Sequence, residues 1–298
     1  MKVLITGANG LVGSWLFNHL SFKFEVTGLV RPSADLFRID TKHHSKIIKA
    51  PVEDWCQVLK KTSFETAILS HWKGVENTYR NDSNQEKNIA LTLNFAECAS
   101  NNGVRNIIGM GSQAELGPVG HAVSEQQTDA PTSAYGRSKV HARVALEKLS
   151  QEKNFRMAWM RIFSVYGPLD VGDWLIPNTI RALLLNQEMK LTEGSQIWSY
   201  LYMSDLVSAF EVTLNTPELH GTIDVGNPST VRVREVTELI SMILRKQSLL
   251  KYGEIPFRED QVMLMQPLCK KLLSVGWAPQ VSLEEGLRST INWFNTRM

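Results

Sequence analysis

The sequence has few cysteines and no long apolar run. Its 298 residues include only Cys56, Cys98 and Cys269, which lie far apart and form no Cys-x-x-Cys pair. This odd number argues against a disulfide framework and a zinc site, and it fits a reducing compartment. No stretch approaches the roughly 18 apolar residues of a membrane span, and the apolar run at 2–5 is too short for a signal-peptide core. We therefore expect a cytoplasmic protein without a membrane partner.

An excess of charge of one sign is also absent. The chain has 32 basic and 30 acidic residues, a net charge of +2, so no broad basic face is expected for nucleic acid. Apolar residues make up 43% and charged residues 21%, which argues against disorder and predicts a globular protein. The seven histidines show no metal-ligand spacing, so no metal site is expected.

Short apolar runs alternate with amphipathic stretches in the first half of the chain. Buried strands are predicted at 2–5, 26–30, 46–48, 67–70, 106–110 and 157–162, and helices between them at 11–22, 53–62, 88–101 and 133–153. This alternation is typical of an α/β fold with a doubly wound parallel sheet. A late apolar run at 222–225 is expected to rejoin that sheet as an outer strand.

The pattern becomes mixed after residue 165. Helices are predicted at 175–188, 205–215, 233–247 and 282–296, with a hairpin-like segment at 190–203. We therefore expect a first domain over 1–165, completed by the strand at 222–225. A smaller, interleaved region is expected over 166–298.

A glycine-rich turn, TGANGLVG at 6–13, follows the first predicted strand and opens a helix. Gly7 permits a tight turn, Gly10 lets a pyrophosphate approach the backbone, and Gly13 allows close packing of helix and strand. The helix N-terminus adds free N–H groups and a positive dipole. A turn without a ligand is the alternative, which the position after the first strand disfavours. The predicted dinucleotide-binding residues here are Gly7, Asn9, Gly10, Leu11, Val12 and Gly13.

The end of the second predicted strand has no acidic residue. NAD-binding folds usually place an acid there for the adenosine ribose, whereas this chain has Arg31 followed by Ser33. Arg31 can pair with a 2′-phosphate and Ser33 can donate a second hydrogen bond, so NADP(H) is preferred. NAD(H) remains possible, because Arg31 could instead be a solvated loop residue.

A candidate acid–base group lies further along the chain. Tyr135 and Lys139 are four residues apart on a predicted helix and share a face. We expect the ammonium to favour the phenolate and so lower the phenol's pKa toward neutrality. Ser112 ends the fifth predicted strand and is placed to bind the same substrate oxygen. Chance spacing of Tyr135 and Lys139, and a turn-capping role for Ser112, are the alternatives.

Together these motifs resemble the extended short-chain dehydrogenase/reductases, in particular the NAD(P)-dependent sugar-nucleotide epimerase/dehydratase group. The resemblance implies a Rossmann-type domain with Ser112, Tyr135 and Lys139 as catalytic residues, and a C-terminal region that binds a nucleotide-diphospho-sugar. It also implies a homodimer formed through the helices at 88–101 and 133–153, a role for Lys139 at the nicotinamide ribose, and a cofactor contact for Tyr135. The matching segments are TGANGLVG at 6–13, KNIALTLNFAECASNNGVRNIIGMGSQAE at 87–115, PTSAYGRSK at 131–139, RIFSVYGP at 161–168, YLYMSDLVSAF at 200–210 and VGWAPQVSLEEGLRSTINWF at 275–294.

The reaction within this group is predicted to be ketone reduction. The acid pair of 4,6-dehydratases is missing, because Gln113 and Ala114 follow Ser112. Arg31 points to a cofactor that is used and released, and the segments SQAE and KLTEGSQIWSYLYMSDL are similar to CDP-abequose and CDP-paratose synthases. Those enzymes reduce a 4-keto-deoxyhexose and would place the protein in lipopolysaccharide O-antigen biosynthesis. The alternatives are an epimerase with retained cofactor and a non-catalytic NADP-binding regulator.

Three further residues are expected to contact the sugar nucleotide. Many relatives have Arg-Asp where this chain has Trp198-Ser199, so the diphosphate must be held elsewhere. Arg258 lies where the family places a second diphosphate-binding arginine, and Trp198 could stack on a ring. Trp72 follows the fourth predicted strand and is expected to face the active-site crevice. A structural role is the alternative for each of the three.

Overall fold

The computed structural model describes residues 1–259 and 261–297. They form two compact units that are interleaved along the chain. The first unit comprises Met1–Glu115, Pro131–Ile162 and Val207–Ile223, and the second comprises Leu116–Ala130, Phe163–Leu206 and Asp224–Met298.

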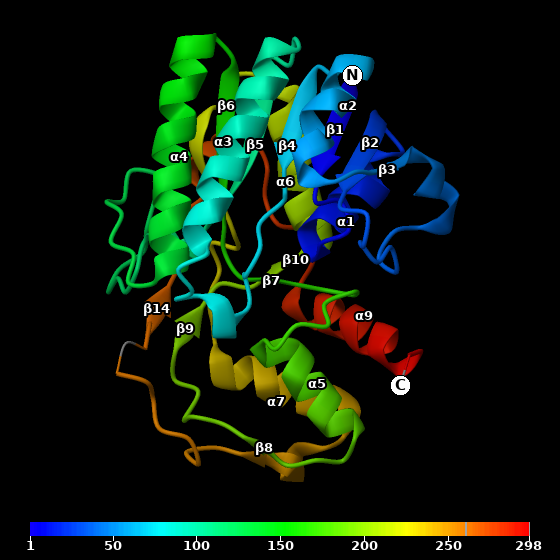
Figure 1. The fold of residues 1–298 in the computed structure, drawn as a ribbon. Coiled ribbons are helices and arrows are strands. Elements are labelled where there is room, and N and C mark those ends of the chain that lie inside the picture. Colours follow the sequence, from blue (N-terminus) through cyan, green and yellow to red (C-terminus); the bar gives the residue numbers. More distant parts are fainter. Residues whose placement is uncertain (260, 298) are drawn as a thin grey trace. The chain divides into compact units, whose positions relative to one another are not determined.

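A seven-stranded sheet organises the first unit, with strand order β11-β6-β5-β4-β1-β2-β3 (Figure 1). The strands from β3 to β6 run parallel to their neighbours. This topology confirms the predicted doubly wound α/β fold, and the late run at 222–225 is its edge strand β11. The strands are β1 (Lys2–Thr6), β2 (Glu25–Val30), β3 (Ile47–Lys49), β4 (Thr66–Leu69), β5 (Asn106–Ser112), β6 (Arg156–Ile162) and β11 (Gly221–Val225).

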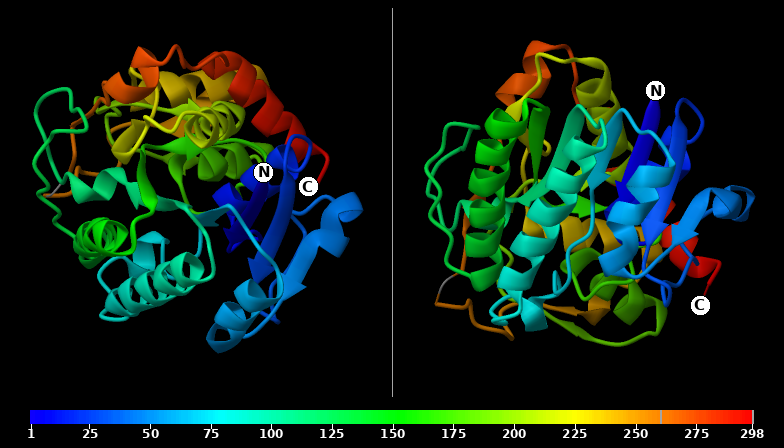
Figure 2. Two further views of the ribbon diagram at one scale, coloured as in Figure 1. Left: turned by 90° about the horizontal axis from the view of Figure 1, so that it is seen from above. Right: turned by 45° about the horizontal axis from the view of Figure 1, so that its top comes forward.

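Helices cover both faces of this sheet. Figure 2 shows α2, α3 and α4 on one face, and the Lys23–Glu211 ion pair links the end of α1 to α6 on the other. Because both faces are covered, the central strands are apolar on both sides, as their continuous hydrophobic runs predicted. The helices are α1 (Leu11–Leu20), α2 (Trp55–Lys61), α3 (Gln85–Asn101), α4 (Ala134–Lys153) and α6 (Met203–Asn215).

The core beneath α2, α3 and α4 is built from large buried side chains. Phe95 of α3, Leu146 of α4 and Trp159 of β6 belong to one apolar cluster and are at most 2% exposed. Burying each such side chain contributes roughly 1.5–3 kcal/mol. The core therefore fixes α3 and α4 against β5, the strand that ends at Ser112.

The second unit consists of short strands and helices that pair across long chain separations. The predicted hairpin at 190–203 is wrong, because its three short strands β8, β9 and β10 pair with other segments. β8 pairs with β13, β9 with β12 and β14, and β10 with β7. The elements are β7 (Val165–Tyr166), α5 (Leu175–Leu184), β8 (Met189–Lys190), β9 (Ile197–Trp198), β10 (Leu201–Tyr202), β12 (Val231–Arg232), α7 (Val233–Leu244), β13 (Leu250–Lys251), β14 (Leu264–Met265), α8 (Lys270–Ser274) and α9 (Leu283–Asn295). The short helix α8 was not predicted.

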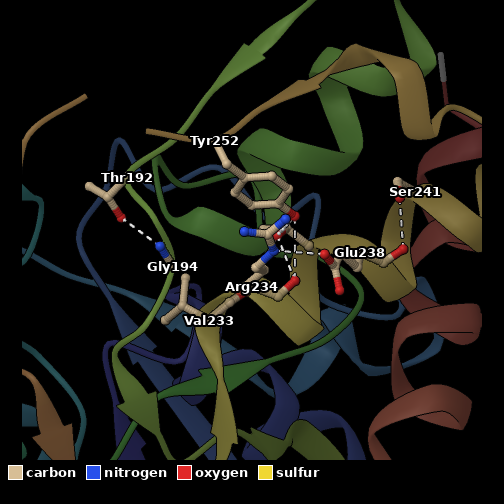
Figure 3. A network of polar contacts seen from close by, with 8 residues as sticks. Thr192, Gly194, Val233, Arg234, Glu238, Ser241 and Tyr252 are labelled. Atoms are coloured by element: carbon tan, nitrogen blue, oxygen red, sulfur yellow. Dashed lines mark hydrogen bonds and ion pairs between the residues drawn. The ribbon is translucent and has the colours of Figure 1, made fainter. Parts of the chain in front are cut away.

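A polar network shows why the segment after β8 does not turn back on itself (Figure 3). Gly194 has φ +70°, and a Cβ there would lie 2.8 Å from that of Arg234. The Arg234 N–H donates to the Gly194 carbonyl at 2.9 Å, which ties the segment to the first turn of α7. The Arg234 guanidinium stacks 4.1 Å from the Tyr252 ring centre, and its Nε donates to Glu238 at 2.8 Å. Contacts to α7 thus replace hairpin pairing.

Within the described residues, every helix is too short or too polar to cross a membrane.

Candidate active site

The glycine-rich turn packs tightly on the end of β4 and leaves its outer side open. Gly7 has φ +65°, and a Cβ there would lie 2.9 Å from the backbone of His71. A Cβ at Gly13 would overlap the Gly7 carbonyl oxygen, whereas one at Gly10 would meet only that oxygen at 3.4 Å. Gly10 caps α1 without a side-chain hydrogen bond to the first N–H groups. Asn9, Leu11 and Val12 are half-buried around this cap, so the turn fits a phosphate group.

The loop after β2 and the end of the neighbouring strand β3 each carry an exposed cationic side chain, Arg31 and Lys49. Arg31 and Ser33 are both exposed. Lys49 of β3 pairs with Val30 in the sheet register, and its Nζ donates to the Ala34 carbonyl of this loop at 3.2 Å. Lys49 was not predicted as a site residue. The parallel pairing of β2 and β3 brings it beside the loop that follows β2. The loop and the end of β3 therefore offer Arg31, Lys49 and the Ser33 hydroxyl to an anion.

Local contacts at the N-terminus of α4 place Tyr135. Ser133 caps the helix and accepts the Gly136 N–H at 3.1 Å. The Tyr135 N–H donates to the Arg80 carbonyl at 2.8 Å. A Cβ at Gly136 would overlap the carbonyl oxygen of Ala114. Only glycine lets the helix lie this close to the turn that follows β5.

This close approach brings the Tyr135 and Ser112 hydroxyls together. Their side chains hydrogen-bond each other, and Tyr135 is only 7% exposed. Ser112 Oγ also accepts the Ala114 N–H at 3.2 Å. Ser112 thus caps the turn and, through the same oxygen, contacts the phenol.

Lys139 lies one helical turn after Tyr135 and is held by a carbonyl and an aromatic ring. Its Nζ donates to the Met110 carbonyl at 2.7 Å and lies 3.7 Å from the centre of the Trp72 ring. Trp72 is edge-to-face with Tyr135 at 6.2 Å between ring centres. Its indole N–H donates to Gln85 at 2.8 Å. Burial lowers the pKa of Lys139 to about 7, because the charged form loses its hydration.

The expectation that Lys139 lowers the phenol's pKa is wrong in this structure. Burial raises the pKa of Tyr135 above its ordinary value. The hydrogen bond to Ser112 and the charge of Arg80, whose guanidinium lies 5.5 Å from the ring centre, act in the opposite direction. Lys139 instead faces Met110 and Trp72, at 5.7 Å from the centre of the Tyr135 ring. Arg80 was not predicted as a site residue.

Glu115 is a completely buried carboxylate beneath Ser112. It accepts the Ser112 N–H at 2.8 Å and the Trp159 indole N–H at 3.0 Å. Arg143 lies 3.4 Å away and Arg161 adds a second favourable charge. Burial nevertheless raises the pKa of Glu115. The carboxylate holds the turn after β5 in the shape that presents the Ser112 hydroxyl.

The role of Glu115 has a signal in the sequence. Gly109 and Gly111 are two apart on β5 and therefore face the same side of the sheet. A Cβ at either position would overlap the Trp159 ring. Two glycines on one strand face indicate that a large side chain crosses the strand. Here that side chain is Trp159, whose indole N–H donates to Glu115.

His71 lies between the glycine-rich turn and the Lys139 region. Its Nδ1 is 2.6 Å from the Thr6 hydroxyl, and the ring is edge-on to Trp55 and Phe95. Its Nε2 is buried and has no hydrogen-bond partner among the described residues. Burial, with a smaller effect from the charge of Lys139, lowers the pKa of His71 to about 3. Sequence reasoning gave this residue no role.

The structure thus gathers Ser112, Tyr135, Lys139 and Trp72 in the first unit, and places Trp198 and Arg258 in the second. The Trp198 indole N–H donates to the Ser164 hydroxyl at 2.6 Å within its own unit. Arg258 is exposed, and its carbonyl accepts the Gln261 N–H at 3.0 Å. In the described part of the chain, His, Cys, Asp and Glu side chains form no cluster of three or more that could hold a metal ion.

This combination of fold and side chains defines a class of dinucleotide-dependent enzymes. Residues 3–226 match the NAD dependent epimerase/dehydratase family. The chain belongs to that family, which consists of enzymes.

Curated relatives and solved structures are similar over most of the chain. A trifunctional UDP-glucose 4,6-dehydratase, UDP-4-keto-6-deoxy-D-glucose 3,5-epimerase and UDP-4-keto-L-rhamnose reductase from Arabidopsis thaliana is 26% identical over 316 aligned residues, covering 98% of this chain and 47% of that protein. The chain therefore spans about half the length of the first relatives it matches. CDP-abequose synthase from Salmonella muenchen is 27% identical over 163 residues, covering 53% of this chain and 55% of that protein. The UDP-glucose 4-epimerase of Thermus thermophilus, solved with NAD, has TM-score 0.89 at 21% identity and covers 100% of both chains.

Proposed function

We propose that the chain is an NADPH-dependent reductase of the 4-keto group of a nucleotide-diphospho-deoxysugar. The observation that carries the proposal is the hydrogen-bonded pair of Ser112 and Tyr135, with Lys139 one helical turn away. The similarity to CDP-abequose synthase supports a reductase. A dehydratase is disfavoured because Gln113 and Ala114 stand after Ser112.

The roles of the side chains follow from their protonation and contacts. A bound nicotinamide dinucleotide supplies the hydride for the carbonyl carbon. Tyr135 donates its proton to the carbonyl oxygen, and its raised pKa keeps it protonated near neutral pH. Ser112 donates a hydrogen bond to the same oxygen. The Arg80 charge stabilises the phenolate that remains, since opposite charges favour the ionised form.

The dinucleotide would be held at two places in the first unit. The turn from Gly7 to Gly13 offers its backbone N–H groups to the pyrophosphate. Arg31, Lys49 and Ser33 favour a 2′-phosphate, which supports NADP(H) over NAD(H). Lys139 and Tyr135 are assigned to the nicotinamide ribose.

The sugar nucleotide would contact Trp72, Trp198 and Arg258. Trp72 already shares an edge-to-face contact with Tyr135, so it borders the reacting groups. For Trp198 and Arg258 the support is their position in the family pattern. The affinities of the Trp198→Ala and Arg258→Ala variants for the sugar nucleotide and for the free nucleoside diphosphate test whether each residue binds the sugar or the nucleotide part.

A substrate panel tests the proposed reaction. The purified protein is incubated with NADPH and CDP-, dTDP-, GDP- or UDP-linked 4-keto-deoxyhexoses, and the loss of NADPH absorbance is followed. We expect stoichiometric oxidation of NADPH with one of them. Binding of NADPH without oxidation by any member of the panel would contradict the proposed substrate class.

Epimerisation with a retained cofactor is the second candidate. The family name includes epimerases, and the Ser112–Tyr135 pair could pass a proton in either direction. An absorbance spectrum of the purified protein separates the two reactions, because stoichiometric co-purified dinucleotide favours epimerisation. A non-catalytic regulator is disfavoured, because it would not need Ser112, Tyr135 and Lys139 together.

A homodimer through α3 and α4 remains part of the proposal. These helices lie side by side (Figures 1 and 2), and Val144 of α4 is 52% exposed. A Val144→Glu variant is expected to sediment as a monomer if this face forms the dimer. Monomeric behaviour of the unmodified chain would contradict the dimer. We also keep the prediction of a cytoplasmic protein, which the three free cysteines support.

A further inference from the structure

Two of the three cysteines meet in a surface pocket of the first unit. Cys56 lies on α2 and Cys98 on α3, and both are partly exposed. They line the same pocket, which has a volume of about 410 Å³. Lys60, Asn94, Glu97, Asn101 and Asn102 complete its wall. The residues assigned to the reaction are not among those that line it.

The two thiols are in direct contact. Cys98 and Cys56 hydrogen-bond each other through their side chains. The side-chain amide of Asn102 donates to the Cys98 sulfur at 3.7 Å. Burial and the neighbouring Cys56 raise the pKa of Cys98 to about 12, while Lys60 acts in the opposite direction. Cys98 also packs against the apolar core of this unit, whereas Cys56 is not part of that cluster, so we assign the first attack on an electrophile to Cys56.

Cys269 provides an internal contrast. It is completely buried, and its thiol donates to the Gly226 carbonyl at 3.4 Å. Burial raises the pKa of this thiol. A buried thiol that holds its proton is inert, so reactions of the folded protein should be confined to the other two cysteines.

We propose that Cys56 and Cys98 form a reversible dithiol–disulfide site whose substrates are small disulfides such as oxidised glutathione. The proposal rests on the thiol–thiol contact and the shared solvent-accessible pocket, and it is independent of the proposed reductase activity. Lys60 and Glu97 place one charge of each sign in the pocket wall, which suits a partner that carries both carboxylate and ammonium groups, as oxidised glutathione does.

The exchange proceeds in two balanced steps. Cys56 loses its proton to solvent, and its thiolate attacks one sulfur of the small disulfide. The S–S bond breaks, one half leaves as a thiol after protonation, and the other half stays on Cys56. Cys98 then gives up its proton and attacks the Cys56 sulfur, which releases the second half as a thiol. The protein loses two protons and two electrons, and the small disulfide is reduced to two thiols.

Mass spectrometry of the full chain tests the site. The folded protein is titrated with oxidised glutathione, quenched by alkylation and weighed intact. We expect two of the three thiols to be lost without a lasting glutathione adduct, and a digest to contain one peptide that links Cys56 to Cys98. Reduction should restore all three thiols. A stable glutathione adduct on the unmodified protein, or three free thiols after prolonged treatment, would overturn the proposal.

Single variants separate the two roles. Cys98→Ser lacks the second thiol, so it should keep one glutathione on Cys56. Cys56→Ser lacks the attacking thiol, and its modification rate should fall at least about tenfold. Cys269→Ser should form the cross-link as the unmodified chain does. Equal modification rates in Cys56→Ser and Cys98→Ser would contradict the order of attack, and a cross-link that involves Cys269 would contradict the site.

Discussion

The cluster around Tyr135 and the loop around Arg31 are built in opposite ways. Tyr135, Lys139 and Glu115 are each at most 7% exposed and are held by hydrogen bonds from neighbouring elements. Arg31 and Ser33 are exposed, because the hydrogen bonds that order their loop, such as those of Asn18 with the backbone at 38 and 40, leave both side chains in solvent. The groups that we propose to exchange protons are therefore preorganised in a dry environment, while the groups proposed to select an anion remain solvated. Substitutions in the cluster should cost far more than those in the loop.

The Tyr135→Phe substitution should show the largest effect. It removes the proton donor while the ring keeps its packing, so turnover should fall roughly 10²- to 10⁴-fold. The dissociation constant for NADPH should stay nearly unchanged. Steady-state kinetics and calorimetry measure the two quantities, with the exposed Tyr79→Phe as control. Undiminished turnover in Tyr135→Phe would remove the assigned role.

His71 should make folding sensitive to acid. Its folded pKa of about 3 lies below the ordinary value of 6.5, so between these values the unfolded chain binds a proton that the folded chain does not. The contribution of neutral His71 to the free energy of unfolding is therefore fully present above about pH 6.5. It is lost as the pH decreases, by roughly 3 kcal/mol at about pH 4. His71→Phe should flatten this dependence in urea unfolding at several pH values. His121→Gln, at an exposed position, should leave it unchanged; equal slopes in all three proteins would contradict the assignment.

The Glu115→Gln substitution tests whether the buried carboxylate positions Ser112. The amide oxygen can still accept both N–H groups, but an uncharged NH2 group then faces Arg143 in place of the second carboxylate oxygen, so the turn should shift. A displacement of this kind lowers kcat about 10- to 100-fold, with NADPH affinity retained. Glu147→Gln, on an exposed part of α4, is the matched control. If the Glu115 variant loses only stability and keeps kcat, the residue is structural.

The Arg31→Ala substitution should have the smallest effect. An exposed cation contributes modestly to anion binding, so NADPH affinity should fall about five- to tenfold and NADH affinity should hardly change. Adding Lys49→Ala to Arg31→Ala should enlarge the difference between the losses of NADPH and NADH affinity. Adding Lys61→Ala instead should not enlarge it. Fluorescence titration with both dinucleotides gives the ratio. Equal weakening of NADPH and NADH would contradict a role in selecting the 2′-phosphate.

The sequence predicted the first unit better than the second for a physical reason. The strands of the large sheet are apolar runs, and β1, β3, β4 and β5 are each followed by a helix, so periodicity locates them. The strands of the second unit are mostly two residues long and pair far along the chain, as β9 does with β12 and β14. A local pattern such as 190–203 therefore predicts a hairpin where tertiary contacts impose other partners.

The candidate site divides in a similar way. Tyr135 and Lys139 were predictable because both lie on one helix, and Ser112 because it ends a strand. Arg80 and His71 act through neighbours that the fold brings together, which spacing does not reveal, whereas Glu115 has only the indirect signal of Gly109 and Gly111. The Cys56–Cys98 pair was missed for the same reason, since its members lie on different helices. Buried side chains that support a site therefore require coordinates.

The contact of Gly136 with the Ala114 carbonyl has an evolutionary consequence. The turn after β5 and the start of α4 meet directly, although residues 116–130 separate them along the chain. Leu116 and Val123 of that segment are buried in a core cluster, but its exposed positions, such as Gly120 and His121, can change while the spacing of the two hydroxyls stays the same. A lineage can thus change these exposed side chains without moving the Ser112–Tyr135 pair that we propose for proton transfer.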